Sequence, residues 1–335
     1  MVGEFIARAG WPGAQMTLIA GDASNRRYFR LRHADTGQSA VLMDAPAEKG
    51  EDVRPFVRIA RHLASLGFSA PRILLADGGA GLLLLEDLGN ALFARVLEAA
   101  PKMENSLYCA ATDLLFALHR HPPPTGLGAY DPPLMTDLAA LSFDWYLRGV
   151  TGSPAPRRRQ RFCAAFGPLL AAHAAADVLS LRDYHAENLL WLPARAGLAR
   201  VGLLDFQDGM AGHRAYDLVS LLQDARRDVP CDIEVAMLAR YIAASGQDSA
   251  GFRAAYHLLG AQRNLRILGV FARLCLRDGK ARYLRLIPRV WSLLERDLAH
   301  PVLAPIRPHL AESLPAPTPR ILARLKEKCA TIPAL

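Results

Sequence analysis

Lysine and cysteine are both scarce in this chain. Only five of its 40 basic residues are lysines, at positions 49, 102, 280, 326 and 328, and the arginines are spread along the sequence. The net charge of +8 permits anionic partners, but a dispersed charge of this kind does not predict a nucleic-acid-binding surface. The five cysteines include no CxxC pair, which argues against a disulfide framework or a zinc site and favours a reducing compartment.

Long uninterrupted apolar segments are missing as well. The longest stretch without charge, residues 162–176, contains Gly167-Pro168 and is too short to span a bilayer. Glu4 and Arg8 interrupt the N-terminal segment where a secretory signal needs apolar residues. We therefore expect a cytoplasmic protein with no membrane partner. Hydrophobic residues make up 51% of the 335 positions and charged residues 21%, which is enough apolar material for a substantial core.

The character of the predicted secondary structure changes near residue 90. Before it, short apolar segments alternate with turn residues, which predicts one helix over 51–66 and strands at 16–20, 27–31, 40–43, 71–76 and 81–85. After it, helical spacing dominates, except for short apolar segments at 177–180, 189–192 and 201–204. The shift predicts a strand-rich lobe followed by a mostly helical lobe.

Carboxylate and amide side chains stand at the ends of these late apolar segments. Asp183 and Asn188 precede the segment at 189–192, and Asp205 directly follows the segment at 201–204. Their oxygen atoms are the ligand type that Mg²⁺ prefers. The spacing suits phosphoryl transfer, in which one carboxylate accepts the proton of the attacking hydroxyl while a carboxylate and an amide oxygen hold the metal.

The same positions match a known kinase pattern. The sequence L-R-D-Y-H-A-E-N at 181–188, followed by D-F-Q at 205–207, corresponds to H-R-D-x-x-x-x-N followed by D-F-G. Further stretches that match in order are GDASNRRYFRL at 21–31, VLMDAP at 41–46, EDVRPFVRIARHL at 51–63, LLLLEDLG at 82–89, RDYHAENL at 182–189, LLDFQD at 203–208 and AYDLVSLLQDAR at 215–226. On these stretches the chain resembles the aminoglycoside phosphotransferase branch of the protein-kinase-like fold, and within it the bacterial anomeric kinases of N-acetylmuramate and N-acetylglucosamine that serve cell-wall recycling.

The resemblance implies a two-lobed α+β fold. A small antiparallel-sheet lobe that binds the nucleotide would cover residues 1–88 and end in a hinge. A larger, mostly helical lobe with the catalytic loop, metal site and sugar pocket would cover 89–335. The resemblance also implies ATP and Mg²⁺ as cofactors and phosphorylation of the anomeric hydroxyl of an amino sugar. We further expect a monomer with no nucleic-acid partner.

The resemblance also assigns roles to single positions. It implies that Asp183 is the catalytic base, that Asn188 and Asp205 bind Mg²⁺, and that Asp217 supports the site from behind. Glu86 and Leu88 would meet adenine through their backbone, and the turn at 21–25 would cover the phosphates. The residues expected to contact the nucleotide are Ser24, Asn25, Arg27, Lys49, Glu86 and Leu88. The residues close enough to the base to reach sugar hydroxyls are His185, Glu187, Gln207 and Asp208.

Two positions depart from the kinase pattern. Leu181 replaces the motif histidine, which buttresses the loop and does no chemistry. The third predicted strand has no nucleotide-binding lysine, and Lys49 is the only lysine before residue 102. Either Lys49 reaches back to the phosphates, or an arginine such as Arg27 or Arg30 takes the lysine's place.

Three other functions stay open on the sequence alone. The first is an aminoglycoside or other small-alcohol kinase of the same fold, which the net charge of +8 disfavours because such drugs are polycations. The second is a non-catalytic nucleotide-binding module, which the missing strand lysine and Leu181 would suit. The third is nucleic-acid binding, which rests on charge alone.

Overall fold

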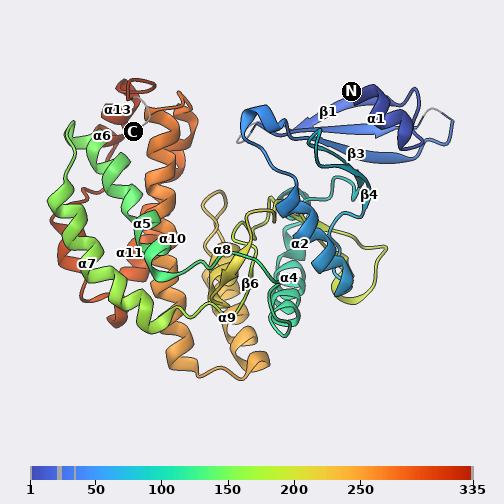
Figure 1. The fold of residues 1–335 in the computed structure, drawn as a ribbon. Helices are drawn as coiled ribbons and strands as arrows, with labels where there is room; N and C mark the ends of the chain where they lie inside the picture. The colour runs from blue at the N-terminus through green and yellow to red at the C-terminus, as the bar shows by residue number, and fades with distance from the viewer. Residues whose placement is uncertain (1, 21–24, 34, 333–335) are drawn as a thin grey trace. The chain divides into compact units, whose positions relative to one another are not determined.

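The computed structural model describes residues 2–20, 25–33 and 35–332. The chain forms two compact units (Figure 1). Unit 1 takes the chain up to residue 118, together with 124–126 and 181–209, and unit 2 takes 119–123, 127–180 and the chain from 210 onward. The predicted lobe boundary between residues 88 and 89 stays a prediction.

Unit 1 contains a five-stranded antiparallel sheet, as predicted. Its strands follow the order β1-β2-β3-β5-β4. Because β5 lies between β3 and β4 and its four leucines are all buried, its sequence is apolar without alternation. The strands are β1 (Gln15–Ala20), β2 (Arg27–Arg32), β3 (Ser39–Asp44), β4 (Ile73–Asp77) and β5 (Leu82–Glu86).

Two helices accompany this sheet in the sequence. The predicted helix is α2 (Arg54–Ser65), which begins three residues later than expected and buries an apolar face that includes Phe56 and Leu63. A short helix that was not predicted, α1 (Val2–Arg8), packs Phe5 and Ile6 into the core of the sheet. Seven residues are too few for helical periodicity to show in a sequence.

The segment with the candidate chemistry also belongs to unit 1. It contains the antiparallel pair β7 (Leu189–Trp191) and β8 (Val201–Leu203), preceded along the chain by α3 (Phe93–Ala99) and α4 (Glu104–Leu118). The backbone N–H of Leu203 donates to the Ser69 carbonyl at 2.9 Å, and the Ser69 hydroxyl donates to the Ala199 carbonyl at 2.7 Å. These bonds tie the β7–β8 pair to the chain that enters β4.

Unit 2 is mostly helical, with one small antiparallel pair in which β6 joins the unpredicted strand β9. The longest helix, α10, contacts α5, α8 and α11. None of the described helices combines the length and the apolar composition needed to cross a bilayer. The elements are α5 (Pro132–Leu141), α6 (Arg148–Thr151), α7 (Pro156–His173), β6 (Val178–Ser180), β9 (Met210–Gly212), α8 (Ala215–Leu222), α9 (Cys231–Ser245), α10 (Ser249–Leu276), α11 (Ile287–Leu298), α12 (Arg307–Ala311) and α13 (Pro319–Glu327).

One helix of unit 2 differs from the prediction. The periodicity over 134–148 predicts a single helix, but a π-helical turn at Ser142–Leu147 separates α5 from α6. A π-turn closes its hydrogen bonds one residue further along the chain than an α-helix does. Apolar spacing is hardly changed by one extra residue, so the sequence pattern does not show it.

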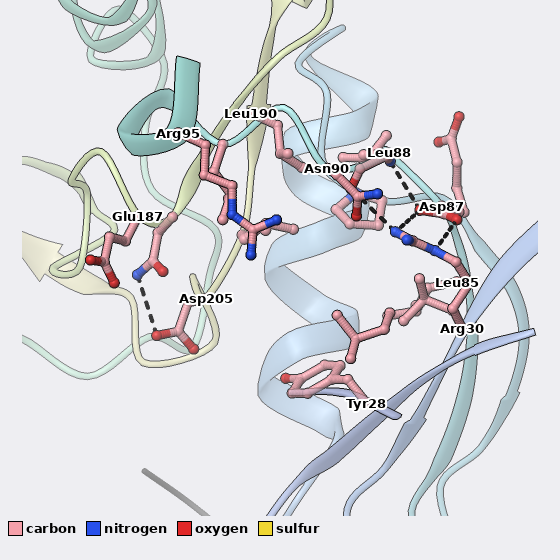
Figure 2. Close-up of a pocket in the computed structure, with 18 of the residues that line it drawn as sticks. Tyr28, Arg30, Leu85, Asp87, Leu88, Asn90, Arg95, Glu187, Leu190 and Asp205 are labelled. Carbon is pink, nitrogen blue, oxygen red and sulfur yellow. Dashed lines mark hydrogen bonds and ion pairs between the residues drawn. The ribbon is translucent and has the colours of Figure 1, made fainter. Parts of the chain in front are cut away.

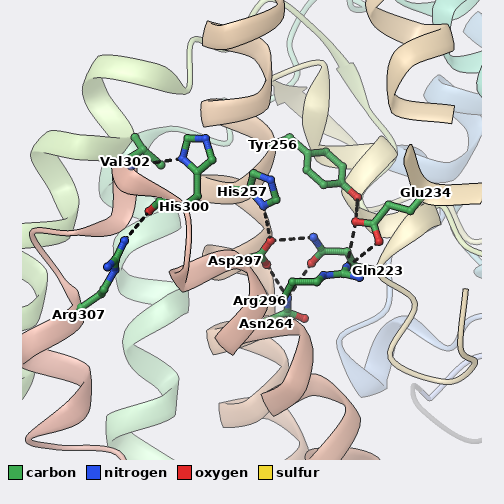
Figure 3. Close-up of polar contacts among 10 residues, drawn as sticks. All are labelled: Gln223, Glu234, Tyr256, His257, Asn264, Arg296, Asp297, His300, Val302 and Arg307. Atoms are coloured by element: carbon green, nitrogen blue, oxygen red, sulfur yellow. Dashed lines mark hydrogen bonds and ion pairs between the residues drawn. The ribbon is translucent and has the colours of Figure 1, made fainter. Parts of the chain in front are cut away.

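A buried polar cluster joins α10 and α11 to the end of α8 (Figure 3). The fully buried carboxylate of Asp297 accepts from Gln223 Nε2 at 2.9 Å and from Asn264 Nδ2 at 3.2 Å, and it lies 3.0 Å from His257 Nδ1. Burial raises the pKa of Asp297, and the contacts from His257 and Gln223 oppose that rise only in part. A cluster with this many partners holds the helices in one relative rotation.

The close approach of α10 to α5 gives a stability prediction. A Cβ added to Gly269 would lie 2.3 Å from the carbonyl carbon of Leu141, and a backbone atom cannot move aside without moving its helix. We expect Gly269→Ala to lower the free energy of unfolding by about 1–3 kcal/mol, measured by urea denaturation. Gly3→Ala in α1, where nothing lies within 4 Å, is the matched control. Equal stability of the two variants would contradict the close packing.

Candidate active site

Unit 1 holds a cavity of about 350 Å³, a volume typical of a small-molecule site (Figure 2). Its apolar walls come from Val41 of β3, Phe56 of α2, Leu85 of β5 and Leu190 of β7. The chain over 86–90, which we call the hinge segment, lines the cavity as well. An apolar slot beside backbone N–H and C=O groups suits a flat heteroaromatic ring.

An ion pair fixes the hinge segment. The Arg30 guanidinium binds Asp87 with both ends, Nε–Oδ2 at 2.7 Å and Nη2–Oδ1 at 2.9 Å, and Asp87 also accepts from the Gly89 N–H at 2.9 Å (Figure 2). Burial alone would raise the pKa of Asp87, but the hydrogen bonds from Arg30 and Gly89 outweigh it and hold this pKa below its ordinary value. The ionised carboxylate therefore orders the turn that follows β5.

The side chain of Glu86 is bound by protein groups. One carboxylate oxygen accepts from Arg195 Nη2 at 2.7 Å and the other from Arg72 Nε at 3.3 Å. Arg195 also donates to the Ser69 hydroxyl at 2.6 Å, so this arginine connects the loop between β7 and β8 to the hinge segment. The Glu86 N–H also donates to the Arg72 carbonyl at 2.8 Å, so the predicted backbone contact with a nucleotide would use the Glu86 carbonyl.

Residues 181–188 form a tight loop, the catalytic loop of the prediction. Arg182 has a left-handed backbone with φ of 69°, a conformation that costs free energy in a non-glycine residue and is common at functional sites. The Asp183 carbonyl accepts from Asn188 Nδ2 at 3.0 Å, and the buried Tyr184 hydroxyl donates to the Ala111 carbonyl of α4 at 2.9 Å. Leu181, in place of the motif histidine, is buried and so fills that position by packing.

Asp205 follows β8, also in a left-handed conformation with φ of 55°. Its carboxylate accepts from Gln207 Nε2 at 2.7 Å and from Asn188 Nδ2 at 3.4 Å. His185, which is buried, lies with its Nε2 at 3.5 Å from the same Asn188 nitrogen. The structure therefore brings Asn188 and Asp205 together, with Asp183 held to Asn188 through its backbone.

The surroundings disfavour negative charge on Asp205. Although part of its side chain reaches solvent, desolvation raises its pKa, and the nearby carboxylates of Asp183 and Asp208 raise it further. Hydrogen bonding by Gln207 and the charge of Arg26 oppose this rise without cancelling it. A carboxylate in this position would gain from a bound cation.

Tyr28 lines the cavity on the side of β2 (Figure 2). Burial raises its pKa to about 12, and the negative charge of Asp205 adds to the effect. The phenol therefore keeps its proton and lies in the cavity as a neutral hydrogen-bonding group.

The donors present fit Mg²⁺ better than a metal held by protein alone. The described residues contain no group of three or more His, Cys, Asp or Glu side chains arranged to hold a metal ion. Mg²⁺ is commonly bound by one or two protein oxygens together with water and substrate phosphates. The Asn188 amide oxygen and the Asp205 carboxylate are donors of this kind, and the Asn188 Nδ2 group, which donates to the Asp183 carbonyl and to Asp205, keeps the two side chains together.

The other predicted residues fall into four groups. Ser24 lies outside the described residues. Asn25, Arg27 and Lys49 do not line the cavity: Asn25 Nδ2 donates to the Lys49 carbonyl at 3.1 Å, and Arg27 pairs with Asp44. The residues that lie at the cavity or next to Asn188 and Asp205 are Glu86, Leu88, His185, Glu187 and Gln207, while Asp208 is exposed and accepts from Arg182 through its carbonyl.

Two contacts of this site were missed by the sequence analysis. Arg26 Nε forms an ion pair with Glu51 at 2.8 Å, and the ring of Phe56 stacks on Phe206 with centroids 4.8 Å apart. Both pairs join residues far apart in sequence. The only signal for them in the sequence is that all four residues fall inside the matching stretches at 21–31, 51–63 and 203–208.

An apolar slot bordered by the hinge segment, with Asn188 and Asp205 beside it, is the arrangement expected of a kinase-like phosphotransferase. The chain belongs to the phosphotransferase enzyme family (APH), which it matches over residues 15–257. Among curated proteins it is similar to an N-acetylmuramate/N-acetylglucosamine kinase of Caulobacter vibrioides, with 41% identity over 94% of this chain and 96% of the relative. A protein of the same name from Pseudomonas aeruginosa is 36% identical over 92% of this chain and 90% of the relative.

Solved structures agree on the fold. The ADP-bound aminoglycoside phosphotransferase APH(2'')-Ib superposes with a TM-score of 0.58 at 11% identity, over 84% of this chain and 92% of that one. An ethanolamine kinase of Plasmodium vivax gives a TM-score of 0.56 at 12% identity, over 87% of this chain and 84% of that one. At such low identities these structural similarities show the fold and do not indicate which acceptor is phosphorylated.

The ion pair at the hinge segment gives a second stability prediction. Asp87→Asn removes the charge that Arg30 binds, so we expect the free energy of unfolding to fall by about 1–3 kcal/mol in chemical denaturation. Asp77→Asn is the matched control, because Asp77 pairs with Arg8, whose side chain is 63% exposed, and exposed pairs contribute little. A loss as small as that of the control would show that the pair does not order the hinge segment.

Asp205 gives a pH-dependent prediction. A carboxyl whose folded-state pKa lies above its ordinary value of 3.8 opposes folding once it is ionised. Asp205→Asn should therefore melt at a higher temperature than the wild type at pH 7. The difference should shrink as the pH falls below that ordinary value, where the carboxyl is protonated in both states. Thermal unfolding followed by circular dichroism checks this, and a variant that melts lower at pH 7 would contradict it.

Proposed function

We propose that this chain is an ATP-dependent sugar kinase that phosphorylates the anomeric C1 hydroxyl of N-acetylmuramate, N-acetylglucosamine or both, for peptidoglycan recycling. The acceptor comes from the curated relatives, which carry that name at up to 41% identity over nearly the whole chain. The reaction type is supported by one structural observation above all: unit 1 alone brings an apolar slot together with Asn188 and Asp205.

The proposed nucleotide position follows from the shape of the cavity. Adenine would lie between Val41, Leu85 and Leu190, and the backbone of Glu86 and Leu88 would hydrogen-bond its edge. The phosphates would then extend toward Asn188 and Asp205, which would hold Mg²⁺. When bound, this ion neutralises charge on the phosphates and favours transfer of the γ-phosphoryl group.

Asp183 is proposed as the base. Its carboxylate would accept the proton of the C1 hydroxyl as the hydroxyl oxygen bonds to the γ-phosphorus. The bond from that phosphorus to the bridging oxygen breaks, and ADP leaves with the electron pair. The left-handed turn at Arg182 and the bond from Asn188 to the Asp183 carbonyl hold the loop for this role.

The sugar would contact side chains next to this base. We assign this role to His185, Glu187, Gln207 and Asp208, which lie on the catalytic loop or directly after Asp205. Asp217 is proposed as support behind the site, because it accepts a hydrogen bond from the Ser180 hydroxyl at 3.0 Å just before the loop begins. The enzyme would act as a monomer in the cytoplasm, without nucleic acid or membrane partners.

The function is tested by acceptor-dependent ADP release with Mg²⁺ and ATP. We expect turnover with N-acetylmuramate or N-acetylglucosamine and none above background with kanamycin or choline. Turnover with kanamycin or choline alone would keep the phosphotransferase chemistry and reject the sugar. ATP binding with no acceptor-dependent release would point to a non-catalytic module.

The catalytic role of Asp183 has its own prediction. Asp183→Asn should lower kcat by about 10²–10⁴-fold, because the amide cannot accept the proton, while ATP affinity changes little. A matched control is Asp113→Asn on α4 of the same unit, which should leave kcat unchanged. Wild-type kcat in Asp183→Asn would reject the mechanism.

A further inference from the structure

The missing strand lysine leaves the nucleotide phosphates without an obvious positive partner. The third strand, β3 (Ser39–Asp44), contains no lysine, and none of the three candidates from the sequence is placed to fill the role. Arg30 is held by Asp87 at the hinge segment, the side chain of Arg27 is 56% exposed and pairs with Asp44, and Lys49 is exposed.

Arg26 is built into the structure differently. Its Nε pairs with Glu51 Oε2 at 2.8 Å, and the two side chains are only 15% and 11% exposed. The other oxygen of Glu51 accepts from the Asn25 N–H at 3.0 Å. Glu51 is thus held at both oxygens, and it fixes the guanidinium of the residue that directly follows Asn25.

Arg26 does not itself line the cavity, but it directly precedes β2 and lies two positions before Tyr28 and four before Arg30, which both line it. It hydrogen-bonds the side chain of Tyr28, a lining residue, and its charge acts on both Tyr28 and Asp205. Figure 2 shows Asp205 and Glu187 at one end of the drawn site and Asp87 at the other. The charge of Arg26 thus acts at the end that carries Asp205, whereas Arg30 is bound at the hinge end.

We infer that Arg26, positioned by Glu51, holds the nucleotide phosphates in the place of the strand lysine. The inference rests on the nucleotide-binding part of the proposed function. In protein kinases the corresponding lysine is itself held by an ion pair with a glutamate at the neighbouring helix, and Glu51 lies just before α2. A guanidinium carries five N–H donors and keeps its charge at any physiological pH, so a contact with Glu51 through Nε is compatible with binding phosphate oxygens as well.

The test compares ligands that differ only in phosphates. Dissociation constants for adenosine, AMP, ADP and ATP are measured by calorimetry without metal ions, so that no turnover is needed. We expect Arg26→Ala to raise the dissociation constants of ADP and ATP by about tenfold or more, while the dissociation constant of adenosine stays that of the wild type. Unchanged adenosine affinity also shows that the cavity of the variant is folded. Arg26→Lys, which keeps the charge, should recover part of the loss.

Other variants separate the inference from its rivals. Arg54→Ala is the matched control, because Arg54 is 86% exposed and its ion pair among the described residues is with the neighbouring Asp52, so ATP affinity should not change. Glu51→Gln should lower the affinity for ATP less than Arg26→Ala does. Loss of ATP affinity in Lys49→Ala or Arg27→Ala but not in Arg26→Ala, or equal loss of adenosine and ATP affinity in Arg26→Ala, would overturn the inference. A wild-type protein that binds none of the four ligands would overturn the proposed function with it.

Discussion

The site of this enzyme depends on how the β7–β8 pair is attached to the hinge segment. Asn188 and Asp205 stand at the ends of these two short strands, and three-residue strands hold no orientation by themselves. Arg195 supplies the attachment by donating to Ser69 and Glu86 at once, at 2.6 and 2.7 Å. Because hydrogen bonds to a charged group are stronger than neutral ones, this small network can fix Asn188 and Asp205, the proposed metal ligands, against the cavity.

Apolar packing acts in the same direction as this network. Phe206, next to Asp205, stacks on Phe56 of α2, and the Leu203 N–H pairs with the Ser69 carbonyl. A movement of α2 would therefore shift Phe206 and, with it, Asp205. The same helix begins just after Glu51, which holds Arg26, so both charged groups of the proposed phosphate site, Arg26 and Asp205, depend on the position of one helix.

Much of this architecture could be predicted from the sequence, because the patterns that reveal it lie within short stretches of the chain. Strands β1 to β5 could be predicted because apolar segments and turn residues alternate over short distances, and Asp183, Asn188 and Asp205 could be singled out by residue type and spacing. The partners of the arginines could not be predicted. Arg26, Arg27 and Arg30 lie within five positions, yet each pairs with a different acid that only the tertiary fold brings near. The contacts of Ser69 and Arg195 could not be predicted either, because they too join residues far apart in the sequence.

The regiochemistry of transfer is the point on which the chemical proposal depends most. The direct measurement is phosphorus and carbon NMR of the product formed from ATP, Mg²⁺ and N-acetylglucosamine labelled with ¹³C at C1. Transfer to the anomeric hydroxyl predicts a new phosphate resonance that couples to the labelled carbon. A phosphate that shows no coupling to C1, or consumption of ATP with no sugar phosphate formed, would contradict the proposed reaction.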